Sequence, residues 1–150
     1  MKILLAVDGS KHSDSAVKIL NNFKLSDADE IKIVSVVDMV MPMAIDIYAG
    51  YILTSGEIEK TVRENAEAIV ENAAQKIKQL FDGINILIST EVLHGSPESC
   101  IVQSAEASKS DLIIVGSHGY NRWERLLLGS VSNSVVLHAH CSVLVVRSPK

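Results

Sequence analysis

Aromatic residues, cysteine and excess positive charge are all scarce in this sequence. Aromatic residues make up 4% of the chain, which argues against a platform on which nucleic-acid bases stack. The chain has 14 Lys and Arg against 18 Asp and Glu, a net charge of −4, whereas a general nucleic-acid binder needs excess cations to neutralise phosphates. We therefore expect no nucleic-acid partner.

Long apolar runs are also missing. The longest strictly apolar run is Ile3-Leu4-Leu5-Ala6-Val7, which Asp8 ends, whereas a membrane-spanning helix needs about 20 apolar residues. The run is also too short for the apolar core of a signal peptide, so we expect no membrane association and a cytoplasmic location. In that compartment Cys100 and Cys141 are expected as reduced thiols, and a disulfide between them is the alternative.

What the chain does contain predicts a globular protein. Apolar residues make up 47% of the 150 residues. A domain of that length buries roughly 70% of the surface that its unfolded chain exposes. We expect a single domain over residues 1–150, folded around its own core without support from a metal or a disulfide.

Strand and helix signals alternate along the chain. Continuous apolar runs predict buried strands, and capping residues followed by three- and four-residue apolar spacing predict helices. The predicted strands cover residues 2–7, 31–37, 84–93, 112–115 and 142–146. The predicted helices begin at Ser10 or Ser13, at the capping box Thr54-Ser55-Gly56-Glu57, at Ser96-Pro97-Glu98 and at Gly129. Residues 38–53 have no clear period and are predicted as a long loop.

The second helix is predicted to bury one face and to end at Asp82-Gly83. The residues on that face recur at three- and four-residue steps, and they are Ile58, Val62, Ala66, Ile69, Ala73, Ile77 and Leu80.

Five strands alternating with four helices predict an α/β fold. We expect a Rossmann-like or flavodoxin-like open sheet of five parallel strands in the order 3-2-1-4-5, with helices on both faces. Such sheets bind ligands beyond the carboxyl ends of their strands, at a topological switch point. Three segments meet this condition, namely Asp8-Gly9-Ser10, Val37-Asp38 and the segment from Gly116 onward.

A glycine-rich segment follows the fourth predicted strand. Gly116-Ser117-His118-Gly119 leaves the strand, and nine residues later Gly129-Ser130 comes directly before a helix. Glycines permit positive φ and let backbone N–H groups approach a phosphate, and a helix N-terminus presents unpaired N–H groups. The hydroxyls of Ser130 and Ser132 could add donors. The alternative is an ordinary strand-exit turn with Gly129 as a helix cap.

These glycines carry a resemblance to a known family. Gly116-x2-Gly119-x9-Gly129-Ser130 resembles the G-2x-G-9x-G-(S/T) nucleotide motif of the universal stress protein family. ILLAVDGS at 3–10, SDLIIVGSH at 110–118 and LLLGSVSNSVVLHAHCSVLVVR at 126–147 resemble its first strand, its fourth strand, and its closing helix and strand. Members are small α/β proteins, often dimers, and one branch binds ATP or related adenine nucleotides. The complete motif implies that this chain is similar to that branch.

The resemblance also implies roles for individual residues. Asp8 would lie near the ribose or a bound Mg²⁺, since a carboxylate can accept ribose hydroxyl bonds or ligate a hard cation. The backbone near Val7 and Val37 would frame the adenine. The motif would hold the ribose and phosphates, and the residues concerned are Gly116, Gly119, Gly129, Ser130, Val131 and Ser132.

Other polar residues near the motif have alternative interpretations. His118 could touch a phosphate or be an exposed loop residue, and Arg122 and Arg125 could screen phosphate charge or be solvated. The segment His138–Cys141 stands at a helix end, where histidine caps carbonyls, and we expect no metal there.

The hypothesis that follows is a stress-response regulatory module that binds ATP, ADP or AMP, with or without Mg²⁺. We expect a homodimer through the last strand, residues 142–147, because an apolar sheet edge needs a cover. The alternatives are a slow ATPase or nucleotidyl-transfer enzyme, and a nucleotide-free dimeric scaffold. The sequence has no P-loop lysine motif and no identifiable catalytic residue, so we expect at most weak ATP hydrolysis.

Overall fold

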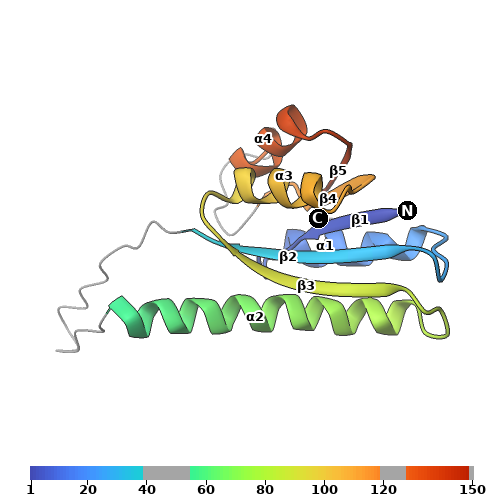
Figure 1. Cartoon of the computed structure of the whole chain (residues 1–150), viewed down its shortest axis with the longest axis horizontal. Coiled ribbons are helices and arrows are strands. Elements are labelled where there is room, and N and C mark those ends of the chain that lie inside the picture. Colours follow the sequence, from blue (N-terminus) through green and yellow to red (C-terminus); the bar gives the residue numbers. More distant parts are fainter. Residues whose placement is uncertain (39–54, 119–127, 149–150) are drawn as a thin grey trace.

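The structure of the protein, a computed structural model, describes residues 1–38, 55–118 and 128–148. These residues form one sheet of five parallel strands in the order β3-β2-β1-β4-β5 (Figure 1). The strands are β1 (Lys2–Ala6), β2 (Glu30–Val37), β3 (Leu87–His94), β4 (Leu112–Gly116) and β5 (Ser142–Val146). The predicted fold and strand order are confirmed.

Helices cover both faces of the sheet. The first face packs against α1 (Lys11–Ile19), which continues as a 3₁₀ turn over Leu20–Asn22, and against α2 (Ser55–Leu80). The second face packs against α3 (Pro97–Ala107) and α4 (Ser130–His138), which lie on the opposite side from α2 in Figure 1. The result is a three-layer arrangement with a core on each side of the sheet.

The central strand β1 shows why a continuous apolar run becomes a strand here. Successive side chains of a strand point to opposite faces. Ile3 and Leu5 join the core under α1 and α2, whereas Leu4 and Ala6 join the core under α3 and α4. Because helices cover both faces, every position of the strand interior is buried, as the run predicts.

The helix starts follow the predicted capping residues. Ser10 is the N-cap of α1, and its hydroxyl oxygen accepts a hydrogen bond from the backbone N–H of Ser13 at 3.3 Å. Ser96 is the N-cap of α3, and Pro97 follows it in the first turn. The Ser96 hydroxyl also donates to Glu98, which lowers the pKa of that carboxyl.

The third strand begins later than predicted, at Leu87 instead of residue 84. Phe81 to Gly83 form a turn, in which the N–H of Ile84 donates to Phe81 at 3.0 Å, and the N–H of Ile86 then donates to Ile84. The neighbouring strand β2 begins at Glu30, which is paired with Leu87. Residues 84–86 therefore have no partner strand beside them.

The buried face of α2 lies in its middle and C-terminal turns. Ala66, Ala73 and Ile77 are buried as predicted, whereas Val62 and Leu80 are 38% and 37% exposed. The N-terminal turns of α2 extend past the strands (Figure 1), so the apolar side chains there have no strand to pack against. The predicted loop from residue 39 onward and Thr54 of the predicted capping box lie outside the described residues.

Both cysteines are free thiols, as predicted. Burial raises the pKa of Cys100 and of Cys141, so the protonated thiol is favoured at neutral pH. Among the described helices none is both long and apolar enough to cross a membrane.

Candidate functional site

A cavity of about 310 Å³ opens at the carboxyl ends of β1 and β4. After β1 the chain adds β2 and β3 on one side of β1, and it then crosses over to add β4 and β5 on the other side. The gap between β1 and β4 is therefore the topological switch point of the sheet. The wall is formed by residues of β1, β2 and β4, the turn after β1, the segment after β4, and the first turns of α3 and α4. The lining residues are Ala6, Val7, Asp8, Ser13, Val34, Val36, Pro97, Ile101, Val115, Gly116, His118, Gly129, Ser130, Val131 and Ser132.

Most of the predicted site residues meet at this cavity. Seven of them line it, and they are Val7, Asp8, Gly116, Gly129, Ser130, Val131 and Ser132. Gly119 lies outside the described residues, as do Arg122 and Arg125. Val37 is not among the lining residues. Its neighbour Val36 lines the cavity, and successive side chains of a strand point to opposite faces, so the side chain of Val37 points to the other face.

Sequence reasoning missed the apolar part of the wall. Val34 and Val36 of β2 lie two positions apart and therefore share the sheet face that α3 and α4 cover. Ile101 of α3 and Val115 of β4 belong to the same core. The strand alternation could have identified Val34 and Val36, but only packing brings α3 against them.

Asp8 is held by the turn that follows β1. Gly9 has φ 80, a left-handed conformation that glycine adopts without steric cost. This turn lets Asp8 Oδ1 accept a hydrogen bond from the backbone N–H of Ser10 at 2.9 Å. The Oδ2 atom has no hydrogen bond to any described residue, so one carboxylate oxygen at the cavity wall is available to a ligand or a cation.

The N-terminus of α4 contributes backbone donors to the cavity wall. Gly129 is the N-cap, and the N–H of Asn133 donates to the carbonyl of Gly129 at 2.9 Å. The N–H groups of Ser130, Val131 and Ser132 precede that first helical bond and have no intrahelical partner. Together with the helix dipole, they make this end of α4 attractive to an anion.

The hydroxyl of Ser132 has a structural role that the sequence did not predict. Ser132 is 2% exposed, and its Oγ donates to the carbonyls of Ser117 at 3.1 Å and Gly129 at 3.0 Å. Its one hydrogen is therefore already used within the protein. The donor that Ser132 can offer to a ligand is its backbone N–H.

The two described motif glycines are required by close packing and not by positive φ. Gly129 has φ −61, and Gly116 is also outside the left-handed region. A Cβ on Gly116 would come within 3.0 Å of the backbone carbon of His12, and one on Gly129 within 3.1 Å of the carbonyl oxygen of Ser117. Both glycines thus let the segment after β4 fit between α1 and α4.

The cavity could hold a metal ion only together with a ligand. Asp8 is the one carboxylate among the lining residues, and no cluster of three His, Cys, Asp or Glu side chains exists within residues 1–38, 55–118 and 128–148. Mg²⁺ prefers octahedral oxygen ligands and is often bound by one or two carboxylates with substrate phosphates and water. The residues present therefore fit Mg²⁺ that arrives bound to phosphates.

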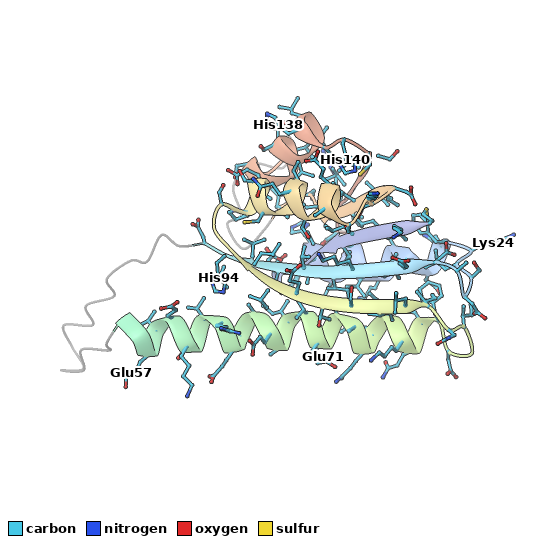
Figure 2. The ribbon with its side chains drawn as sticks, viewed as in Figure 1. Lys24, Glu57, Glu71, His94, His138 and His140 are labelled. Atoms are coloured by element: carbon cyan, nitrogen blue, oxygen red, sulfur yellow. The ribbon has the colours of Figure 1, made fainter. Side chains whose placement is uncertain are left out.

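The histidines at the end of α4 are not among the residues that line this cavity. Figure 2 shows His138 and His140 on the side of the molecule opposite to α2. His138 Nδ1 donates to the carbonyl of Ser134 at 2.8 Å. That bond satisfies a carbonyl near the helix C-terminus, which is the role predicted for a histidine there.

Comparisons with known proteins agree on one family. The profile of the universal stress protein family (Usp) matches residues 1–147. Universal stress protein MJ0531 of Methanocaldococcus jannaschii is 36% identical over 149 residues, which cover 99% of this chain and 83% of that protein. The solved structure of MJ0577 from the same organism has a TM-score of 0.81 at 28% identity and covers 99% of this chain and 96% of its own.

A second solved structure shares the fold at lower identity. It is a universal stress protein family protein from Arabidopsis thaliana with AMP bound, with a TM-score of 0.68, 18% identity, and coverage of 99% of this chain and 92% of its own. At that identity the likeness concerns the fold. The family profile and the relative at 36% identity show that the chain belongs to the universal stress protein family.

Proposed function

We propose that this protein binds an adenine nucleotide, ATP, ADP or AMP, in the cavity between β1 and β4, and acts as a regulatory module in the stress response. The observation that carries the proposal is that two kinds of polar group line one cavity at the switch point, namely the Asp8 carboxylate and the first N–H groups of α4. A relative with the same fold has AMP bound. In this proposal the whole chain, residues 1–150, is one nucleotide-binding domain.

The chemistry of the wall suggests how the nucleotide would lie. The apolar side chains of Val34 and Val36 would pack against the adenine ring, and Val36 takes the place that the sequence assigned to Val37. The backbone of Val7 would frame the ring, because its side chain belongs to the core on the other face of the sheet. Asp8 would accept a bond from a ribose hydroxyl or share Mg²⁺ with the phosphates. The phosphates would lie at the first turn of α4, against the N–H groups of Ser130 and Val131.

A regulatory role is favoured over fast catalysis by the side chains in the wall. Among the described lining residues only Asp8 and His118 carry groups that ionise, and none is a lysine. A fast phosphoryl-transfer site needs several positioned charges to stabilise its transition state. The free thiols of Cys100 and Cys141 agree with a cytoplasmic site of action, which is part of the proposal.

Thermal unfolding with and without nucleotide tests the binding proposal. The protein is stripped of copurified nucleotide and then mixed with ATP, ADP or AMP, with and without Mg²⁺. At 100 times Kd a ligand adds about 2.7 kcal/mol, which raises Tm by about 5–10 °C for a chain of this size. No shift with any of the three nucleotides at millimolar concentration contradicts the proposal.

A matched pair of variants assigns the binding to this cavity. Asp8→Asn keeps an acceptor for the N–H of Ser10 but removes the negative charge, so we expect weaker binding of Mg²⁺–ATP by about tenfold or more. Glu71 is exposed on the outer side of α2 (Figure 2), and Glu71→Gln should bind as the unmodified protein does. Equal effects of the two substitutions would mean that the nucleotide binds elsewhere.

We also propose that two copies pair through β5. This strand lies at the sheet edge, and the adjoining helix α4 exposes 45% of Val136 and 70% of Leu137. The tail does not run along this edge at Ser148, because the Ser148 hydroxyl donates to the carbonyl of Lys11 at 3.0 Å. A twofold pairing of β5 edges would satisfy unpaired backbone groups and cover the apolar side chains.

The geometry of β5 offers a selective test of this dimer. The carbonyl of Val146 accepts from the N–H of Ser117 at 2.8 Å, so Val146 directs its backbone groups toward β4. Backbone direction alternates along a strand, so the N–H of Val145 faces outward. Val145→Pro should therefore give a folded monomer, measured by light scattering at micromolar concentration. A monomeric unmodified protein contradicts the dimer, and a dimeric Val145→Pro protein contradicts its assignment to β5.

A further inference from the structure

Part of the cavity wall is formed by apolar residues of the protein core. Ala6, Val34 and Val115 come from three strands of the sheet, and Ile101 comes from α3. All four belong to the core between the sheet and the helices α3 and α4, and each is at most 7% exposed. We call these four residues the apolar floor. A ligand group that reaches the floor meets side chains that offer neither a donor nor an acceptor.

The end of the cavity at β2 and α3 has no polar side chain among the described lining residues. Those two elements contribute Val34, Val36, Pro97 and Ile101. The carbonyl of Val34 already accepts from the N–H of Val7 at 2.9 Å, and a proline has no N–H to offer. A polar group of a ligand that is buried between these side chains therefore lacks a side-chain partner.

The polar side chains of the wall come from other segments. These segments are the turn after β1, the helix α1, the segment after β4 and the first turn of α4, and the residues are Asp8, Ser13, His118, Ser130 and Ser132. The Ser13 hydroxyl is already bonded, because it donates to the carbonyl of Ser10 at 3.0 Å. The cavity thus has a polar end, to which the proposed site assigns the ribose and phosphates, and an apolar end for the base.

The chemistry of adenine decides which of its edges fits the apolar end. A purine is joined to the ribose through its five-membered ring, so its six-membered ring extends away from the polar end. On that ring N1, N3 and the 6-amino group need hydrogen-bond partners, and burial without a partner is costly. The C2–H group is the one edge of the ring that can face the apolar floor without such a loss.

We propose that Ile101 selects the base of the nucleotide, because it packs against C2 of adenine and offers no partner to a polar group there. Guanine carries an amino group at C2, and this donor would be buried against the apolar floor without an acceptor. Ile101 is then a specificity-determining residue that favours adenine nucleotides over guanine nucleotides. The inference rests on the proposed nucleotide site and adds the side chain that distinguishes the base.

Titration calorimetry with ATP and 2-aminoadenosine triphosphate (2-amino-ATP) tests the inference, because these ligands differ only at C2. We expect the Kd of 2-amino-ATP to be about 10 to 100 times that of ATP for the unmodified protein. The size control is 2-chloro-ATP, whose substituent is at least as large but donates no hydrogen bond. It should bind more tightly than 2-amino-ATP does, and equal Kd values for these two analogues contradict selection by polarity.

Two variants of Ile101 that share one shape assign the selection to this residue. In Ile101→Thr the hydroxyl can donate to the carbonyl of Pro97, four residues earlier in α3, and its oxygen can then accept from the 2-amino group. Ile101→Val has the same shape without that acceptor. We expect the ratio of Kd for 2-amino-ATP to Kd for ATP to be at least about fivefold lower in Ile101→Thr than in Ile101→Val.

Ile101→Val also gives a test that does not need a hydroxyl in the core. It shortens the side chain by one methyl group and should make room at C2, so the ratio of Kd for 2-chloro-ATP to Kd for ATP should fall by about threefold. An unchanged ratio contradicts the contact between Ile101 and C2. Each ratio is measured within one protein, so a general loss of stability cancels, and cooperative thermal unfolding confirms that the variant folds.

The possible failures are distinguishable. If ATP, ADP and AMP do not bind the unmodified protein, the proposed function fails and this inference with it. If ATP and 2-amino-ATP bind equally well, the nucleotide site stands and selection at C2 is refuted. If 2-amino-ATP binds weakly and to the same extent in Ile101→Thr and Ile101→Val, the assignment to Ile101 is refuted.

Discussion

Gly116→Ala measures how tightly the segment after β4 is packed against α1. A Cβ at this position would lie 3.0 Å from the backbone carbon and the Cβ of His12 and 3.2 Å from its carbonyl oxygen. Carbon atoms pack best at about 3.5–4.0 Å, so one segment must move by about 0.5 Å or more. The obstacle is backbone, and no rotation of a side chain can relieve it.

The cost of that movement follows from what holds α1. Ala16 is fully buried and Val17 is 3% exposed, so a shift of the helix disturbs the core under it. Overpacking of this kind costs about 1–3 kcal/mol, and the lower entropy of the unfolded Ala chain offsets about 0.4–1 kcal/mol. We expect a net loss of about 1–2 kcal/mol, or a Tm lower by about 2–8 °C.

Urea unfolding of the nucleotide-free protein is the appropriate assay, because Gly116 also lines the cavity and bound ligand would add its own stability. Gly56→Ala is the control, since a Cβ there meets nothing within 4 Å and Gly56 lies inside α2. That substitution should be neutral or stabilising by up to about 1 kcal/mol. A Gly116→Ala protein within about 0.5 kcal/mol of the unmodified one refutes the packing argument.

Three other predictions concern stability. Ser132→Ala removes the hydroxyl that donates to the carbonyls of Ser117 and Gly129. We expect the free energy of unfolding in urea to fall by about 1 kcal/mol, and an unchanged value contradicts the structural role of that hydroxyl. Ile33→Ala, at a fully buried position of β2, should cost about 2–5 kcal/mol in the same assay, and a cost below about 1 kcal/mol contradicts the packing of this core. The Met1 ammonium and then Ser26 donate to Asp29 and lower its pKa from 3.8 to about 2, so its stabilising effect is present above pH 3.8 and is lost as pH falls toward 2. The free energy of unfolding, measured between pH 4 and pH 2, should therefore depend less on pH in Asp29→Asn than in the unmodified protein. An equal pH dependence of the two proteins contradicts this role of Asp29.

The sequence by itself determined the order of elements and the family. Alternating strand and helix signals require parallel strands with crossover helices, and the continuous run at 3–7 requires burial on both faces. Capping residues are equally local, which explains why α1 and α3 begin where Ser10 and Ser96 predict. Positions at the carboxyl ends of β1 and β4 were identifiable for the same reason, since strand direction follows from the connections.

The features that the sequence did not predict depend on contacts with residues that are distant in the chain. The start of β3 depends on where β2 begins beside it, and Val62 is exposed because the sheet does not extend under the first turns of α2. The motif suggested positive φ at Gly116 and Gly129, whereas close contacts with His12 and Ser117 are what exclude a Cβ. No local pattern encodes such contacts.

Only the tertiary structure decided the chemistry of the polar wall. His12, Ser117 and Ser148 are separated by more than 30 residues at each step, and they meet because β4 lies between β1 and β5. His118, which lines the cavity, joins this group through the contact of its Nδ1 with Ser117 Oγ at 3.2 Å. Hydrogen bonds act over about 3 Å, so these contacts follow from the strand order and not from neighbours in sequence.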